Sequence, residues 1–179
     1  MLQKLSIVKT MDYFFTYPTK NHYLMDISKN INLAHTSVKR NLKQLIKEEI
    51  IIEEIEKKGS RKFPILKANI NNKKYIQYKK IFNHFNLIHS GIIEHIEKVL
   101  TPNVVILFGS YQRGEDIEDS DIDLFIEAKE IELDTHYFEK KLKRKIQLHF
   151  KENFNAYPKE LKNNIINGTI IYGFLEAYK

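Results

Sequence analysis

The sequence contains no cysteine among its 179 residues, and it has no long apolar run. Without thiols the chain can form neither disulfide bridges nor cysteine-ligated metal sites, which is typical of proteins inside cells. The longest unbroken apolar stretch, Val104–Phe108, is far too short to cross a bilayer, and the N-terminus lacks the apolar core of a signal peptide. We therefore expect a cytoplasmic protein with no membrane partner.

Positive charge is present in excess, and it is unevenly distributed. The formal net charge is +6, and 42% of the residues are hydrophobic, as in a folded globular chain. Residues 1–70 contain 13 Lys and Arg against 7 Asp and Glu, whereas residues 71–179 contain 16 of each. The excess charge of the first 70 residues predicts an anionic partner, with nucleic acid the first candidate.

Residues 1–70 are predicted to form three amphipathic helices followed by a hairpin. The predicted elements are helices over Leu5–Phe15 and Leu24–Ile31, a third helix capped by Thr36, and strands over Ile50–Lys57 and Lys62–Leu66 joined by a turn at residues 58–61. This order of elements resembles the winged helix-turn-helix family.

The resemblance to winged helices implies a nucleic-acid interface with two parts. The third helix would present side chains to the major groove, and the hairpin would reach phosphate groups. These residues are Ser37, Lys39, Arg40 and Lys43 on the helix, with Lys57, Lys58, Arg61 and Lys62 at the hairpin. Glu48 and Glu53 lie close by and weaken a positive field, so a protein-interaction or structural role for the hairpin stays open.

Residues 71–100 are predicted to connect two modules, the second of which covers residues 101–179. The aromatic spacing predicts a helix over residues 72–88, followed by a helix over Ile92–Leu100 that Ser90 can cap. The first of these helices would bury Tyr75, Tyr78, Phe82, Phe85 and Ile88, and would expose Lys73, Lys74, Lys79 and Lys80.

The stretch that carries chemistry follows the apolar run Val104–Phe108. This run predicts a buried strand, and Gly109 lets the backbone turn sharply at its end. A helix starting at Ser110 or the next residue would leave its first N–H groups free beside this turn, where they favour an anion. Asp121 and Asp123 are two residues apart in a predicted second strand and point to one face. An anion site beside paired carboxylates predicts a metal–nucleotide site.

Taken together, Gly109-Ser110, Arg113-Gly114 and Ser120–Leu124 resemble the signature of the DNA polymerase beta-like nucleotidyltransferase superfamily. The resemblance is in particular to its small prokaryotic branch, the minimal nucleotidyltransferases, several of which carry a winged helix. It implies an α/β (α+β) fold with a small mixed sheet backed by helices. The remaining predicted elements are a helix through Arg144 that Asp134 can cap, a strand over Lys145–Phe150, a helix over Lys159–Ile166 and a strand over Thr169–Phe174.

The resemblance also implies a role for each residue of the signature. Asp121 and Asp123 would be the catalytic residues and would bind Mg²⁺, which prefers hard oxygen ligands. The implied nucleotide-binding residues are Gly109, Ser110, Arg113 and Ser120, with ATP the expected nucleotide. Arg113 could instead pair with the acidic loop that follows it, and Ser120 could fix the approach to the strand.

One position departs from the family pattern. Active members supply a third carboxylate from a neighbouring strand, and the matching position here is Gln147. An amide is neutral, so it cannot serve as a general base for an acceptor hydroxyl, and it removes one negative charge from the metal site. His149 lies on the same face of that strand, but imidazole is a poor ligand for magnesium.

Two functions are consistent with these residues. The first is a magnesium-dependent nucleotidyltransferase that moves a nucleoside monophosphate from a nucleoside triphosphate to a hydroxyl. In the minimal branch, that hydroxyl often belongs to a partner protein, commonly a toxin encoded beside the enzyme. The second is a non-catalytic DNA-binding regulator whose degenerate transferase domain binds nucleotide or mediates assembly.

Overall fold

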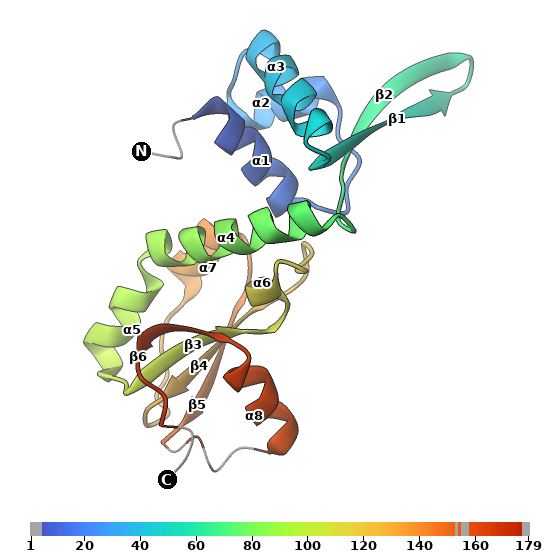
Figure 1. Cartoon of the computed structure of the whole chain (residues 1–179). Helices are drawn as coiled ribbons and strands as arrows, with labels where there is room; N and C mark the ends of the chain where they lie inside the picture. The colour runs from blue at the N-terminus through green and yellow to red at the C-terminus, as the bar shows by residue number, and fades with distance from the viewer. Residues whose placement is uncertain (1–4, 153, 155–157, 177–179) are drawn as a thin grey trace. The chain divides into compact units, whose positions relative to one another are not determined.

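The computed structural model describes residues 5–152, 154 and 158–176 (Figure 1), apart from the side chain of Lys58. The chain divides into two compact units, Met1–Lys79 and Lys80–Lys179. The division falls inside helix α4 (Lys73–Ser90), in the segment that the sequence assigned to the connecting helices. No helix of the described residues is long and apolar enough to span a membrane.

The first unit consists of three helices and an antiparallel hairpin (Figure 1). The elements are α1 (Ser6–Thr16), α2 (Leu24–Ile31), α3 (His35–Lys47), β1 (Ile51–Lys58) and β2 (Arg61–Ala68). Their core contains Phe14, Ile27 and Val38, each with no exposed surface. This is the order of elements that the sequence predicted, while the winged helix-turn-helix assignment itself stays a prediction.

Two local predictions for this unit were wrong. Helix α3 begins at His35 after Ala34, and no side chain caps it, so Thr36 lies inside the first turn and does not cap it. The strands extend further than predicted, and only Gly59 and Ser60 separate them. Gly59 has a φ of +63°, which glycine adopts without steric cost, and this allows the tighter turn.

The buried face of α4 also differs from the prediction. Tyr78 and Ile88 are exposed, with 37% and 52% of their surface accessible, whereas Lys79 is only 1% exposed. The buried positions follow Tyr75, Lys79 and Asn83 at intervals of four residues, and this stripe includes polar side chains. A reading of the aromatic spacing alone misses such a face, because it assigns the buried stripe by apolar residues.

The second unit is built on a mixed sheet of four strands among the described residues, in the order β5-β4-β3-β6. The strands are β3 (Val104–Phe108), β4 (Ile122–Glu127), β5 (Ile146–Lys151) and β6 (Thr169–Gly173). Strand β3 is antiparallel to β4 and to β6, and β4 is parallel to β5. The predicted mixed α/β class is thereby confirmed.

Helices cover both faces of this sheet (Figure 1). They are α5 (Ile92–Leu100), α6 (Gly109–Arg113), α7 (His136–Leu142) and α8 (Lys159–Ile166). Val105 and Leu107 pack with residues of α5 on one face, whereas Val104 and Ile106 pack with Ile165 of α8 on the other. All five residues of β3 are therefore buried, as the apolar run predicted.

Two helices of this unit have different bounds from those predicted. Helix α6 begins at Gly109 itself and contains five residues. Helix α7 ends at Leu142, before the predicted end at Arg144, because Lys143 adopts a left-handed conformation with a φ of +55°. The prediction that Ser90 caps α5 was wrong: Gly91 is the N-cap residue, and no side chain caps the helix. Ser90 is the last residue of α4, and its hydroxyl accepts a hydrogen bond from the Ile92 N–H at 3.2 Å.

Candidate functional site

Two carboxylates stand at the start of β4, on the face of the sheet that α8 covers. Ile122 separates Asp121 from Asp123 and is fully buried toward the opposite face, so both aspartates point to the same side. Gly109 directly adjoins Asp123: a β-carbon on this glycine would lie 2.4 Å from Asp123 Oδ2. The φ of Gly109 is +78°, a conformation that favours glycine, and a β-carbon there would force the Asp123 carboxylate to move.

The neighbouring strand β5 places two nitrogen donors against these carboxylates. In the parallel register, Asp123 lies opposite Gln147, and His149 follows two residues later on the same face. Gln147 Nε2 donates to Asp121 Oδ2 at 2.6 Å, and His149 Nε2 lies 3.1 Å from Asp123 Oδ1. Gln147 therefore occupies the position that the sequence predicted, beside the carboxylate pair.

The donor set suits one magnesium ion. Among the described residues, no group of three or more His, Cys, Asp or Glu side chains could hold a metal. Each aspartate has one oxygen engaged by β5, and the other oxygen makes no hydrogen bond or ion pair within the described part of the chain. Magnesium binds through one or two carboxylates together with waters and substrate phosphates, so Asp121 and Asp123 fit a single ion.

The other predicted nucleotide-binding residues belong to α6 and to the loop before β4. Gly109 and Ser110 begin α6, which is little more than one turn long, so any anion bound there depends on individual N–H groups more than on a helix dipole. Arg113 pairs with Glu115, Nε to Oε2 at 2.7 Å, which is one of the two roles left open by the sequence. Ser120 Oγ accepts from the Ile117 N–H at 2.9 Å and so fixes the loop before β4.

A buried ion pair that the sequence did not reveal anchors this loop. Arg144 and Asp116 are 7% and 2% exposed, and Arg144 Nη2 lies 3.3 Å from Asp116 Oδ2. Asn83 of α4 donates to Asp116 Oδ1 at 2.7 Å and to the Tyr111 carbonyl at 2.8 Å. The only indication of this network in the sequence is Asn83, a polar residue four positions before Leu87, on the face of α4 that the structure buries. The network ties the loop that leads to Asp121 to α4 and to the start of β5.

Comparison with known proteins bears on this unit. Residues 90–174 match the family model described as polymerase beta, nucleotidyltransferase. The match supports the nucleotidyltransferase superfamily for this unit. It begins at Ser90 and so includes α5 as well as the whole sheet.

Other comparisons add little to this. No curated protein sequence matches the chain significantly. A solved structure described as "Possible transcriptional regulator from Methanosarcina mazei Go1" is 20% identical over 52% of this chain and 77% of that one, with a TM-score of 0.36. A likeness at that TM-score carries no argument about function.

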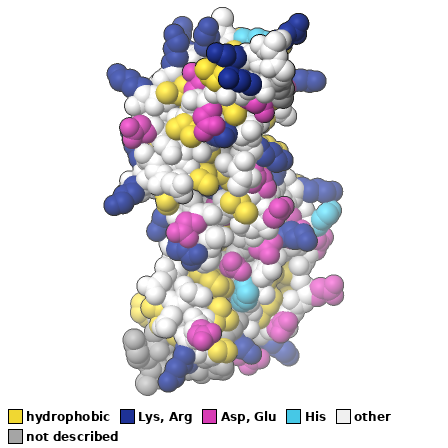
Figure 2. Space-filling model, turned by 90° about the vertical axis from the view of Figure 1, so that its right-hand side faces the viewer, with side chains coloured by type: hydrophobic (Ala, Val, Ile, Leu, Met, Phe, Trp, Pro, Cys, Tyr) yellow, Lys and Arg dark blue, Asp and Glu magenta, His cyan; other side chains and the backbone are white. Residues whose placement is uncertain are grey.

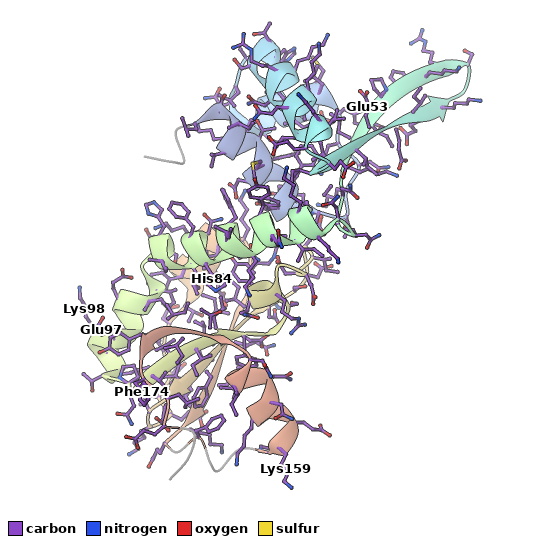
Figure 3. The ribbon with its side chains drawn as sticks, viewed as in Figure 1. Glu53, His84, Glu97, Lys98, Lys159 and Phe174 are labelled. Carbon is purple, nitrogen blue, oxygen red and sulfur yellow. The ribbon has the colours of Figure 1, made fainter. Side chains whose placement is uncertain are left out.

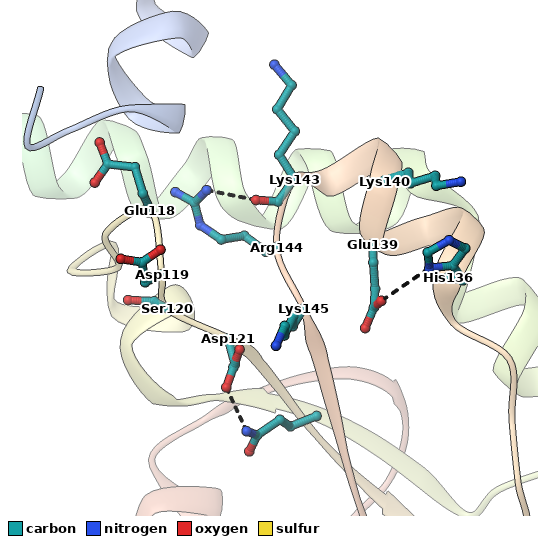
Figure 4. A pocket seen from close by; sticks show the side chains of 11 residues that line it. Glu118, Asp119, Ser120, Asp121, His136, Glu139, Lys140, Lys143, Arg144 and Lys145 are labelled. Carbon is teal, nitrogen blue, oxygen red and sulfur yellow. Dashed lines mark hydrogen bonds and ion pairs between the residues drawn. The ribbon is translucent and has the colours of Figure 1, made fainter.

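The second unit has a pocket of about 590 Å³ that Asp121 lines (Figure 4). Its lining includes Ser120, Asp121 and Gln147 together with Lys140 and Lys145, and Figure 4 shows Lys145 beside Asp121. Gly109 and Ser110 are not among the described residues that line it. The pocket therefore includes Asp121 but not the turn at Gly109. The sequence did not single out these lysines.

The basic residues predicted to contact nucleic acid lie on α3 and on the hairpin of the first unit. Lys39, Arg40 and Lys43 are exposed, and Ser37 is half-buried. At the end of the hairpin, Lys57 lies opposite Lys62, and Lys58 opposite Arg61. Lys57, Arg61 and Lys62 are exposed, while the side chain of Lys58 lies outside the described part. Figure 2 shows Lys and Arg side chains gathered over this unit.

Proposed function

We propose that the second unit binds a nucleoside triphosphate, with ATP the expected one, and transfers its nucleoside monophosphate to a hydroxyl acceptor. The observation that carries the proposal is the pair Asp121 and Asp123 on one face of the sheet, beside a glycine with no room for a β-carbon, inside the segment that matches the nucleotidyltransferase model. The acceptor oxygen forms a bond to the α-phosphorus, and the bond from the α-phosphorus to pyrophosphate breaks.

Each residue of the proposed site would have a separate role, set by its position. Asp121 and Asp123 would hold one Mg²⁺, which when bound neutralises charge on the phosphates as pyrophosphate leaves. Gly109 lets the backbone pass close to Asp123, and the N–H and hydroxyl of Ser110, the next residue, would donate to a phosphate. Gln147 holds Asp121 in place by its amide and takes no proton, so the acceptor proton passes to water or phosphate.

Labelled ATP tests the enzyme directly. The chain with Mg²⁺ and candidate acceptors, including cell-extract protein and RNA, should release pyrophosphate and label the acceptor. Asp121→Asn plus Asp123→Asn should abolish both signals. Glu130→Gln plus Glu132→Gln is the matched control, because these exposed carboxylates have the same spacing away from the site. Release at the same rate from wild type and the aspartate variant would reject the proposal.

A second function is supported by two further observations. Gln147 replaces a carboxylate and its amide already satisfies Asp121, an arrangement suited to holding nucleotide without turnover. In the first unit, Lys57 lies opposite Lys62 across the two strands of the hairpin. Like charges placed opposite each other destabilise a hairpin, so an anionic ligand such as DNA would relieve the cost. The alternative is therefore a DNA-binding regulator with a nucleotide-binding domain that does not catalyse transfer.

Substitution of Gln147 distinguishes the two. Gln147→Asp restores a third carboxylate, and Gln147→Asn is the neutral control of the same length. If the wild type is a regulator, transfer should appear only in Gln147→Asp, while Mg²⁺-dependent ATP binding is present in all three. If the wild type is an enzyme, it should turn over without the substitution. Equal ATP binding by wild type and Asp121→Asn plus Asp123→Asn would reject the metal assignment in both cases.

DNA binding is tested by its salt dependence. Fluorescence anisotropy with labelled duplex should show affinity that falls steeply with salt, because phosphate contacts release counterions. Arg40→Ala plus Arg61→Ala should lower the slope of log affinity against log salt by about 2, at roughly 0.9 per phosphate contact. Lys9→Ala plus Lys29→Ala, exposed positions elsewhere in the unit, should leave the slope unchanged. A salt-insensitive interaction would count against the regulator.

A further inference from the structure

A second pocket lies within the first unit, where α2, α3 and the hairpin meet. Its volume is about 530 Å³, and all its lining residues belong to this unit. Pockets that bind small organic molecules commonly measure roughly 300–1,000 Å³. The pocket is therefore large enough for a ligand and does not depend on the nucleotidyltransferase-family domain.

The wall of this pocket is mainly apolar. Leu42 of α3 and Leu66 of β2 are 5% and 4% exposed and form its buried part. Ile46 and Phe63 are half-buried beside them. Met25, which is 63% exposed, belongs to the same lining at the start of α2. Apolar surface of this kind binds an apolar body by removing it from water.

The charged residues of the lining are two lysines and one glutamate. Lys39 and Lys43 are one turn apart on α3 and both exposed, so their ammonium groups repel each other. Within the described residues, neither ammonium group makes a hydrogen bond or an ion pair. Glu53 comes from β1 on the hairpin (Figure 3). The lining thus carries one excess positive charge, and the two lysines of α3 make no ion pair within the described residues.

We propose that this pocket binds an amphiphilic monoanion, a small molecule with an apolar body and a single carboxylate or sulfonate group. The body lies against Leu42 and Leu66, and the anionic group lies between Lys39 and Lys43. These lysines are also the ones that α3 is proposed to offer to nucleic acid, so ligand and nucleic acid compete for them. Only this competition rests on the proposed DNA binding; the pocket does not.

Titration of the full chain with 8-anilinonaphthalene-1-sulfonate tests the pocket, because this anion fluoresces in apolar surroundings. We expect saturable binding at physiological salt, weakened about tenfold or more by Lys39→Gln plus Lys43→Gln. Lys9→Gln plus Lys29→Gln removes the same charge from exposed positions outside the pocket and should change the affinity by less than about twofold. No saturable binding, or equal weakening by both pairs, would overturn the proposal.

Two further measurements locate the bound anion. Met25→Glu places a carboxylate at the lining without disturbing the core and should weaken the anion, whereas Met25→Gln should not. The neutral probe N-phenyl-1-naphthylamine should bind the wild type and the lysine variant alike. If the neutral probe weakens as much as the anion in the lysine variant, or if both Met25 variants bind the anion equally, the assignment is wrong.

Competition is measured with a duplex that the wild type binds. The sulfonate should release it at concentrations that fill the pocket, and Met25→Glu should need higher concentrations. A duplex that stays bound to a filled pocket would reject the competition. A chain that binds no duplex at all would instead reject the proposed DNA binding, and the two probe titrations would still decide whether the pocket exists.

Discussion

Breaking the buried ion pair between Arg144 and Asp116 should strongly destabilise the second unit. The side chains of Arg144 and Asp116 are 4% and 1% exposed, and the pair is 3.3 Å apart. In Arg144→Met the carboxylate of Asp116 stays buried without the guanidinium of Arg144, while the amide of Asn83 still donates to it. Removal of one partner of a buried pair costs about 3–5 kcal/mol, a large part of the roughly 5–15 kcal/mol that stabilises a domain.

The exposed pair in the same loop provides a matched control. Arg113 and Glu115 are 2.7 Å apart, but their side chains are 50% and 51% exposed. Arg113→Met should therefore cost at most about 1 kcal/mol, although the distance is shorter than in the buried pair. The double variant Asp116→Asn plus Arg144→Met removes both charges, so its cost should be smaller than the sum of the two single costs.

Urea unfolding followed by circular dichroism measures these costs, and hydrogen exchange assigns them to the loop. The two units can unfold separately, so exchange is followed in a peptide that covers residues 110–122. The amides of Glu115 and Ser120, bonded to Ser110 and Ile117, should lose protection in Arg144→Met and keep it in Arg113→Met. Equal stability of the two methionine variants would refute the reasoning, as would strict additivity in the double variant.

Two other predictions concern a glycine and a carboxylate. Gly109→Ala should weaken Mg²⁺-dependent ATP binding by about tenfold or more in calorimetry, because its β-carbon would displace the Asp123 carboxylate. Gly59→Ala is the control: at a φ of +63° with open space around it, the substitution should cost about 1–2 kcal/mol of stability in backbone strain and leave ATP binding intact. Equal effects of the two substitutions on ATP binding would contradict the clash with Asp123. The hydrogen bond from Lys74 lowers the pKa of Glu48, so this carboxylate stabilises the first unit above its unfolded pKa, and the contribution is lost as pH falls below about 4.3. Glu48 and Lys74 are 33% and 46% exposed, so Lys74→Met should reduce the acid dependence of stability by no more than about 1 kcal/mol; an unchanged acid limb in chemical denaturation would disagree.

The local elements were the most predictable part of this protein. The bounds of α2, β3 and α8 agree with the sequence prediction, because apolar periodicity and the proline and glycine beside them are local signals. The prediction of the buried face of α4 failed because local signals do not determine that face. Lys79 reads as a surface residue by its type, and only tertiary contacts bury it. Burial of a lysine depends on what packs around it, and no local pattern records that.

By itself, the sequence determined that Asp121 and Asp123 share a face, because side chains alternate along a strand, and that Gln147 provides no third carboxylate. Only the tertiary structure decided how these residues meet. The parallel register of β4 and β5 brings Gln147 to Asp121 and His149 to Asp123, each pair 26 residues apart in the chain. The tertiary structure also buries Arg144 against Asp116, 28 residues away in the chain. Contacts across such separations depend on strand register and helix packing, which the whole core sets and no short segment specifies.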